Sequence, residues 1–597
     1  MTTNEPNKNH ELAQLSKNLE RVEALSKRLV AAFSKKKPSD SALQAPGADL
    51  FSKAGAAFAT EMINSPAKII EQQVEYWGKT MRHYAAMQQE MLAGSLKAPC
   101  DDSPPDRRFQ NPLWQTNPYF NFVKQQYLTT AKTISDAVKG LEGLDSEEQK
   151  RAEYFSQQIV DMYSPANFLG TNPDALARAV ETEGQSLVDG LENLVRDIEA
   201  NDGELLVNLV DKDAFNVGEN LATSQGSVVF RNRLFELIQY APKGDTVHRT
   251  PIVLFPPWIN KFYILDLKPA NSLIKWIVEQ GFTLFVVSWV NPDASYRDVG
   301  LDTYVKDGFL RAIDEVKQIT GVSQVNAVGY CIAGATLAMT LALMEKRGDK
   351  SVRSATFFTT LTDFSDSGEI GVFLSDDFVD GIEREVTDKG IMASTILSRS
   401  FSYLRSNDLI YGPAIRSYMM GQAPPAFDLL YWNGDSTNLP ARMAVEYLRW
   451  LCQEDRFAQG TLEICGETLS IKDVKVPVCA IACETDHIVN WKASLNGVRQ
   501  FGSRSKTFIL SESGHIAGIV NPPSKKKYGH YTNVGAKKDA DAWYAGAEFH
   551  EGSWWPRWGK WLAGRSGKQV PPAKMGNAEH PVLCDAPGTY VAATPSG

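Results

Sequence analysis

A cysteine lies between two glycines in the segment VNAVGYCIAGATLAMTLALMEK, where a run rich in β-branched residues gives way to a strongly helical stretch. The pattern predicts a strand that ends at Tyr330, a tight turn at Cys331 and a helix that begins at Ile332. Gly329 and Gly334 are small enough for the strand and the helix to approach closely. Since the N-terminus of a helix favours a thiolate, Cys331 is a candidate nucleophile, although a lone cysteine in such a setting is more often a buried core thiol.

Two later segments supply candidate partners for this thiol. The predicted strand VPVCAIAC is followed by Asp486 in ETDHIVNW, and the predicted strand KTFIL is followed by His515 in SESGHIAG. Nucleophile, acid and histidine occur in this order in α/β-hydrolase triads, with the acid and the histidine each placed after a late strand. Asp486 alone could cap a helix and His515 alone could be a surface residue. Their joint placement predicts a triad of Cys331, His515 and Asp486.

Two other histidines are weaker candidates for the base. His487 adjoins Asp486, but neighbouring side chains on an extended segment point in opposite directions. His530 lies in the basic segment KKKYGHY and is expected to be solvated. We therefore predict His515 as the base.

Acyl transfer also needs two backbone N–H groups that stabilise an oxyanion. Ile332, directly after the nucleophile, is expected to supply the first. The loop PPWINKFYILDL after the predicted strand TPIVLF is expected to supply the second, from Trp258 or Ile259. Pro256 and Pro257 restrict this loop but have no N–H to donate.

The elements that must position these residues begin near residue 211, where short β-rich runs such as TPIVLF and TLFVVSWV alternate with helical stretches such as SLIKWIVEQ. This alternation predicts a mostly parallel sheet with flanking helices, the α/β-hydrolase fold, over residues 211–597. The alternation of strands and helices is lost between about 346 and 449, which predicts an inserted cap. Residues 1–210 are predicted to form a mainly helical N-terminal domain whose first residues are disordered.

Composition excludes several classes of protein. The chain has 597 residues, 43% of them hydrophobic, so it can bury more than one core. A net charge of −9 offers no basic field for nucleic acid. The seven cysteines are scattered without paired spacing, so we expect neither a disulfide framework nor a metal site. The polar N-terminus lacks a secretory signal, and no apolar run approaches the roughly 20 residues of a transmembrane helix, so we expect a cytoplasmic protein.

A cysteine nucleophile favours transfer over hydrolysis, because it exchanges one thioester for another at nearly equal energy. With His515 as the base, Cys331 could take an acyl group from CoA, and a hydroxyl group could then attack the acyl-cysteine to form an oxoester. A cap over the sheet would exclude water from this intermediate.

GYCIAG resembles the lipase-like box, usually G-x-C-x-G-G, of polyhydroxyalkanoate synthases. Further segments that resemble this family, from about Asp106 to near the C-terminus, are PPWINKFYILDL, VSWVNP, FDLLYWNGDSTNLP, DHIVNW, SGHIAGIVNPP and GSWWPRWGKWLAG. The length and the helical N-terminal region are similar to those of the single-subunit class I enzymes.

Two positions depart from the pattern of this family. Ala333 replaces a glycine of the box, which requires only that its φ is not positive. Trp258 replaces a smaller residue and is expected to affect the acyl pocket or its entrance.

The resemblance implies that the protein polymerises (R)-3-hydroxyacyl-CoA, of short chain length such as 3-hydroxybutyryl-CoA, into a polyester and releases CoA. It implies Cys331 as the covalent nucleophile and His515 as its base. It leaves two roles open for Asp486, which either orients His515 or helps to activate the 3-hydroxyl group. CoA thioester is then substrate rather than cofactor. A homodimer at cytoplasmic polyester granules, with granule-coat proteins as further partners, is also implied.

Two alternatives remain at this stage. A hydrolase or depolymerase would use the same three residues and admit water, but the cysteine, the cap and the long N-terminal region weigh against it. A catalytically silent granule-binding protein would keep the fold and use its helices for attachment. The presence of Cys331, Asp486 and His515 in the expected order weighs against this second alternative.

Overall fold

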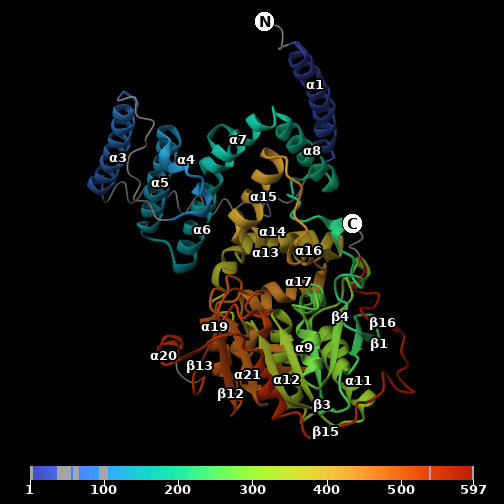
Figure 1. The fold of residues 1–597 in the computed structure, drawn as a ribbon. Coiled ribbons are helices and arrows are strands. Elements are labelled where there is room, and N and C mark those ends of the chain that lie inside the picture. The colour runs from blue at the N-terminus through green and yellow to red at the C-terminus, as the bar shows by residue number, and fades with distance from the viewer. Residues whose placement is uncertain (1–4, 36–55, 58–65, 93–104, 537–538, 594–597) are drawn as a thin grey trace. The chain divides into compact units, whose positions relative to one another are not determined.

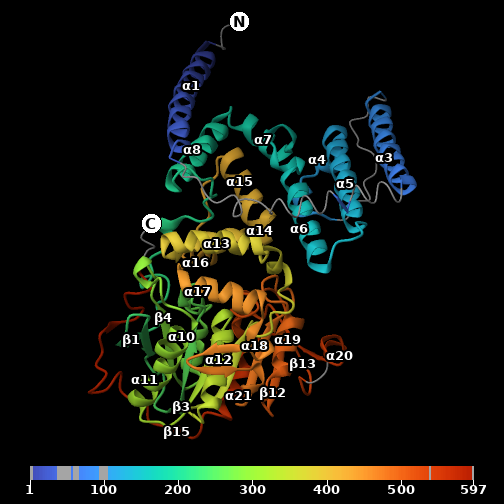
Figure 2. The ribbon, with the colours of Figure 1, turned by 180° about the vertical axis from the view of Figure 1, so that it is seen from behind.

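A sheet of twelve strands, counted over the described residues, organises the larger of the two units into which the chain divides. The computed structural model describes residues 5–35, 56–57, 66–92, 105–536 and 539–593. The larger unit comprises residues 212–404 and 426–597. Helices cover its sheet, as Figures 1 and 2 show.

The middle of the sheet is parallel and its edges are antiparallel. The parallel strands, in spatial order, are β4 (Phe282–Trp289), β3 (Val247–Phe255), β5 (Val325–Tyr330), β6 (Val352–Phe358), β11 (Val478–Cys483) and β12 (Lys506–Ser511). The antiparallel strands are β1 (Gly226–Arg231), β2 (Phe235–Tyr240), β13 (His530–Thr532), β14 (Glu548–His550), β15 (Gln569–Val570) and β16 (Cys584–Asp585). Every residue of β5 and β11 is buried, as expected for parallel strands covered on both faces. The predicted α/β-hydrolase architecture is confirmed.

Helices between the strands provide this cover. They include α9 (Leu273–Glu279), α11 (Arg311–Thr320), α12 (Ile332–Lys346), α19 (Trp491–Gln500) and α21 (Trp555–Ala563). Aromatic contacts join α9 to α21, where Trp276 packs against Trp555 and Trp558. Helix α12, which follows the predicted nucleophile, is buried from Ile332 to Met344. Its start is therefore fixed by packing along most of its length.

The chain leaves the sheet after β6 and returns at β11. Between them lie α13 (Asp376–Lys389), α14 (Ser394–Leu404), α16 (Asp428–Gly434), α17 (Ala441–Glu446) and the π-helix η12 (Tyr447–Gln453). The predicted cap boundary at 346 is wrong, because β6 lies in the main sheet between β5 and β11. Polar residues interrupt the apolar strand pattern of β6 in the sequence, and their side chains are hydrogen-bonded inside the protein. Ser354 Oγ donates to Asn326 Oδ1 at 2.7 Å, and Thr356 Oγ1 accepts the indole N–H of Trp558 at 3.0 Å.

The smaller unit comprises residues 1–211 and 405–425. Its long helices are α1 (Glu5–Phe33), α3 (Pro66–Leu92), α5 (Pro118–Lys139), α6 (Ser146–Met162), α7 (Pro173–Glu181) and α8 (Gln185–Ala200). The helical character predicted for this region is confirmed, whereas the disorder predicted for the first residues concerns residues 1–4, which lie outside the described ranges. Residues 405–425 fall within the interval predicted as cap, yet they group with this helical unit.

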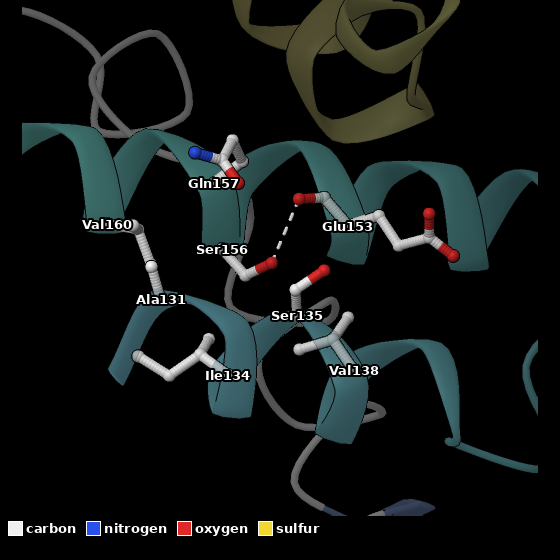
Figure 3. Close-up of a pocket in the computed structure, with 8 residues that line it drawn as sticks. All are labelled: Ala131, Ile134, Ser135, Val138, Glu153, Ser156, Gln157 and Val160. Atoms are coloured by element: carbon white, nitrogen blue, oxygen red, sulfur yellow. Dashed lines mark hydrogen bonds between the residues drawn. The ribbon is translucent and has the colours of Figure 1, made fainter. Parts of the chain in front are cut away.

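Figure 3 shows a small pocket between α5 and α6, with Ala131, Ile134 and Ser135 on one helix and Ser156 and Val160 on the other. Small side chains let the two helices approach closely here, and Ser156 Oγ donates to the carbonyl oxygen of Glu153 at 2.9 Å. None of the predicted site residues lies at this pocket. No helix in the described ranges is long and apolar enough to cross a membrane.

Candidate active site

Cys331 forms a sharp turn between β5 and α12. Its backbone has φ 55° and ψ −126°, a positive φ that is unfavourable for a residue with a Cβ atom. The strain is held by the buried strand before the turn and the buried helix after it, and by a hydrogen bond from Cys331 N–H to the carbonyl oxygen of Phe358 at 2.8 Å. The thiol is half-buried at the first turn of the 15-residue helix. This is the geometry of a nucleophile elbow.

The two glycines beside Cys331 are required by close packing. A Cβ atom at Gly329 would lie 2.6 Å from the Cα of Gly334, and a Cβ atom at Gly334 would lie 2.0 Å from Thr360 Oγ1. Ala333, in contrast, lies in the helical backbone of α12 and is not among the described residues with positive φ. The departure at Ala333 therefore leaves the turn intact, as expected.

His515 and Asp486 meet beyond the ends of β12 and β11. Nδ1 of His515 lies 2.7 Å from Oδ2 of Asp486, whose side chain is fully buried. Oδ1 of Asp486 accepts the backbone N–H groups of Ile488 at 2.8 Å and Val489 at 2.9 Å. Both carboxylate oxygens thus have donors, and the carboxylate is fixed on the Nδ1 side of the imidazole ring.

The imidazole lies between two groups that carry negative charge. Burial alone would lower the pKa of His515, but the Asp486 carboxylate and the Cys331 thiolate raise it to about 10 through charge and hydrogen bonding. The ring of Tyr330 stacks on the His515 ring with centroids 5.8 Å apart, which limits its rotation. The structure therefore brings together all three residues of the predicted triad, in a setting that favours the protonated imidazole of His515.

The loop after β3 lies against α12. The indole N–H of Trp258 donates to Thr336 Oγ1 on that helix at 3.1 Å. Thr437 holds the loop from the other side: its Oγ1 donates to the Trp258 carbonyl oxygen at 2.8 Å, and its N–H donates to the Ile259 carbonyl oxygen at 3.2 Å. Within the described ranges, the N–H groups of Trp258, Ile259 and Ile332 have no hydrogen-bond acceptor. These three N–H groups are therefore unoccupied donors of the kind that an oxyanion hole needs.

An aromatic group that sequence reasoning missed lies beside this loop. The ring of Trp258 packs between Tyr304, with centroids 6.0 Å apart, and Tyr447, with centroids 5.5 Å apart. Burial raises the pKa of Tyr447 well above its usual range, and its interactions with Cys452 and Cys331 raise it further. Tyr447 therefore lies within electrostatic range of the nucleophile. Its segment, MAVEYLRWLC, shows only helical periodicity, so no pattern in the sequence pointed to this role.

The other two histidines have different surroundings. His487 is half-buried beside Asp486, but His515 is the histidine that contacts the carboxylate. The prediction that His530 is solvated is wrong, because pairing of β12 with β13 buries it. Its Nδ1 lies 2.9 Å from the Gly552 carbonyl oxygen, and Arg557 Nε donates to its Nε2 at 3.2 Å. Burial lowers the pKa of His530, so it is a structural histidine.

The described cysteines other than Cys331 show no reactive setting. Burial raises the pKa of each of them, namely Cys452, Cys465, Cys479, Cys483 and Cys584. Within the part of the chain that the structure describes, no group of three or more His, Cys, Asp or Glu side chains is arranged to hold a metal ion.

Comparison with known proteins identifies relatives along most of the chain. Residues 105–277 match the family model of the poly-beta-hydroxybutyrate polymerase N-terminus, and residues 251–522 match that of the alpha/beta hydrolase fold. The chain is 40% identical to the poly(3-hydroxyalkanoate) polymerase of Methylorubrum extorquens, over 89% of this chain and 87% of that one. It is 38% identical to the poly(3-hydroxyalkanoate) polymerase subunits PhaC of Rhizobium meliloti, over 89% of this chain and 86% of that one, and of Cupriavidus necator, over 89% of each.

Proposed function

The chain belongs to the poly(3-hydroxyalkanoate) polymerase family, and we propose that it builds the polyester from (R)-3-hydroxyacyl-CoA through an acyl group held on Cys331. The observation that carries this mechanism is the joint placement of the three side chains. Cys331 occupies a strained elbow, His515 interacts with its thiol, and Asp486 lies 2.7 Å from the far nitrogen of the imidazole.

In the first half-reaction, the Cys331 thiolate attacks the thioester carbonyl carbon of the substrate. The resulting oxyanion accepts hydrogen bonds from Ile332 N–H and from the N–H of Trp258 or Ile259. The carbon–sulfur bond to CoA then breaks, and the CoA thiolate takes the proton held by His515. The products are free CoA and an acyl-cysteine.

In the second half-reaction, a hydroxyl group of another 3-hydroxyacyl unit attacks the acyl-cysteine. His515 accepts the hydroxyl proton, the bond from the acyl carbon to Cys331 Sγ breaks, and an oxoester forms. The enzyme returns to its imidazolium–thiolate pair. Each added unit therefore releases one CoA, and the energy of the thioester drives chain growth.

Asp486 is best suited to orient and charge-stabilise His515. One of its oxygens faces His515 Nδ1 and the other accepts two backbone N–H groups. Three hydrogen bonds to protein groups hold the carboxylate in this position, which favours the orienting role. Of the two roles left open by the sequence, the contacts support orientation of the base.

The surroundings of the acyl group are proposed to select short chains. Trp258 and Tyr447 place two aromatic rings near Cys331, which reduces the space for a long acyl side chain. Tyr447 belongs to the segment between β6 and β11, and its contact with Trp258 is proposed to restrict the access of water to the acyl-cysteine. This exclusion of water supports a polymerase over a hydrolase.

Purified enzyme and (R)-3-hydroxybutyryl-CoA test the mechanism through two readouts, CoA release and the size of the product. We expect polymer from the wild type and neither CoA release nor polymer from Cys331→Ala. A matched control at another half-buried cysteine is Cys584→Ala, which should behave as the wild type. Free hydroxy acid instead of polymer would establish a hydrolase, and activity that survives in Cys331→Ala would overturn the assigned nucleophile.

We further propose that the enzyme acts as a homodimer on polyester granules in the cytoplasm, where granule-coat proteins contact it. The support is family membership. Fractionation of cells that accumulate polymer should recover the protein with the granules, and sedimentation of the purified protein should give the mass of two chains. Recovery in the granule-free fraction or sedimentation as a monomer would contradict these assignments.

A further inference from the structure

We propose that residues 521–528, called the lysine loop below, bind the pyrophosphate and 3′-phosphate groups of a CoA thioester through Lys525, Lys526 and Lys527. The inference rests on the proposed function for the identity of the ligand. It rests on the structure for the site: a closed loop beside His515 that presents three cations without carboxylate partners.

The lysine loop is closed at its base by hydrogen bonds. Asn521, which is 2% exposed, donates from Nδ2 to the Tyr528 carbonyl oxygen at 3.0 Å. The next residue, Gly529, donates its N–H to Glu512 Oε2 at 2.6 Å, and its carbonyl oxygen accepts the N–H of Glu512 at 3.0 Å. Pro522 and Pro523 restrict the backbone further. The three exposed lysines therefore extend from a fixed base, which reduces the entropy lost when they bind a ligand.

The three consecutive lysines differ from many cations of the same unit, which are paired with carboxylates. Within the described ranges, none of the three forms an ion pair with a carboxylate. The cations that do have such partners include Lys261 with Asp435, Lys268 with Asp428, Arg442 with Glu446, Arg449 with Asp380 and Lys492 with Asp541. A run of three positive charges without a counter-charge repels itself unless an anion is bound. The protein as a whole carries a net charge of −9, so a polyanionic substrate needs such a local site.

The lysine loop shares its base with the segment that carries His515. Lys527 Nζ lies 4.9 Å from the centre of the Tyr528 ring, Gly529 after the loop is bonded to Glu512, and interactions with Lys527 and Ser513 lower the pKa of Tyr528. Ser513 precedes His515 by two residues, which span at most about 7 Å of backbone. On the other side, Lys525 Nζ donates to Asn271 Oδ1 at 3.1 Å, and Asn271 belongs to the connection that follows the Trp258 loop. The cations thus lie at the same edge of the sheet as both halves of the candidate active site.

This placement matches the form of the substrate. In a CoA thioester the reacting carbonyl lies at one end of a long neutral arm, and the phosphates lie at the other end. A site that holds the phosphates several residues away from His515 would leave the arm to reach Cys331. The lysine loop would then contribute to substrate binding and not to the chemical step, so its loss should change KM and not kcat.

The test compares two thioesters of (R)-3-hydroxybutyrate, one with CoA and one with N-acetylcysteamine, which lacks every phosphate. The variant is K525Q/K526Q/K527Q. Exposed ion pairs each strengthen binding by roughly a factor of two, so KM for the CoA thioester should rise by about tenfold at unchanged kcat. The rate with the N-acetylcysteamine thioester should not change. The rise of KM with salt, seen for the wild type with the CoA thioester, should become weaker in the variant.

Two further variants control for net charge and for folding. K243Q/K568Q/K574Q removes three other exposed lysines that also have no carboxylate partner in the described ranges, and its KM should match the wild type. K525R/K526R/K527R keeps the charges and should restore the KM.

An unchanged KM in the glutamine variant of the lysine loop, or an equal loss with both thioesters, would overturn the phosphate site. If the wild type released no CoA at all, the proposed function would fail. Calorimetric titration with CoA itself would then still decide the inference, since weaker binding by the glutamine variant supports the site and equal affinity rejects it.

Discussion

A shared proton between Asp363 and Asp455 should make the stability of the enzyme depend on pH. Asp363 follows β6, and Asp455 follows η12 with a left-handed backbone, φ 47°. The Asp455 carboxyl group interacts with that of Asp363, and its buried Oδ2 has no other hydrogen-bond partner in the described residues, so a proton shared with Asp363 would satisfy it. Burial, together with the charge of Asp363, raises the pKa of Asp455 to about 7. Burial opposes ionisation of Asp363 as well, but hydrogen bonds from Ser365 and Gln500 keep its pKa below the usual range.

The size of the effect follows from the shift at Asp455. A rise from 3.8 to about 7 is about 3 pKa units, and each unit is worth about 1.4 kcal/mol, so the coupling is on the order of 4 kcal/mol. Because the pKa is higher in the folded state, the stabilisation is complete below the unfolded pKa near 4 and is lost as pH rises to about 7. Above pH 7 the folded state also loses this proton, and the dependence levels off.

Asp455→Asn should remove this dependence, because an amide can still donate to Asp363 and accept the Phe364 N–H, which lies 3.1 Å from Asp455 Oδ1. We expect the stability of the variant relative to the wild type to increase by up to about 4 kcal/mol between pH 4.5 and pH 8. Thermal unfolding of both proteins over this range, with exposed Asp388→Asn as the matched control, measures the difference. Parallel curves for Asp455→Asn and the wild type would refute the shared proton.

Three further predictions concern the active site. Gly334→Ala should destabilise the protein by about 1–3 kcal/mol, because the new Cβ would lie 2.0 Å from Thr360 Oγ1. Gly434 has open space around it, so Gly434→Ala should leave the stability unchanged. Thermal unfolding of the two variants measures the difference. Asp486→Asn should lower the rate of CoA release by about 10²- to 10⁴-fold. It should also shift the limb of the pH–rate profile that reports His515 to lower pH, because the carboxylate that raises the pKa of His515 is gone. An unshifted profile would contradict that assignment. Thr437→Val should lower kcat by about three- to tenfold through the loss of one hydrogen bond to Trp258, and Thr437→Ser should restore it in the same assay.

The triad could be predicted from sequence because each member follows a strand with a strong apolar pattern. The runs before Cys331, Asp486 and His515 are β5, β11 and β12, which lie in the parallel centre of the sheet. The carboxyl ends of parallel strands lie at one edge, so order along the chain was sufficient to bring these residues together. Their contacts, including the 2.7 Å distance from His515 to Asp486, are consistent with that reasoning.

Other elements depend on partners that are distant in the chain. Strand β2 is wholly buried although it contains Glu236, whose carboxylate accepts the N–H groups of Thr589 at 2.9 Å and Tyr590 at 3.0 Å. Such a residue looks like a surface position until the C-terminal segment is in place. His530 was misjudged for the same reason, because the lysines before it in the chain are exposed while its own strand is paired and buried. The polarity of a sequence segment predicts the exposure of its residues poorly where a contact with a distant segment satisfies the hydrogen bonds of a polar group.

Both carboxylate oxygens of Asp486 accept hydrogen bonds from protein groups. Because one carboxylate oxygen faces His515 Nδ1 and the other accepts two backbone N–H groups, we assign Asp486 the role of orienting the imidazole and not that of taking a proton from the incoming hydroxyl. Under the proposed mechanism, His515 serves both half-reactions, giving a proton to the departing CoA and taking one from the hydroxyl that follows it. These transfers are complementary, so each addition leaves the imidazole in the protonation state that the next thioester needs. In the proposed mechanism, a single histidine between Cys331 and the buried Asp486 carboxylate serves repeated addition without a second base.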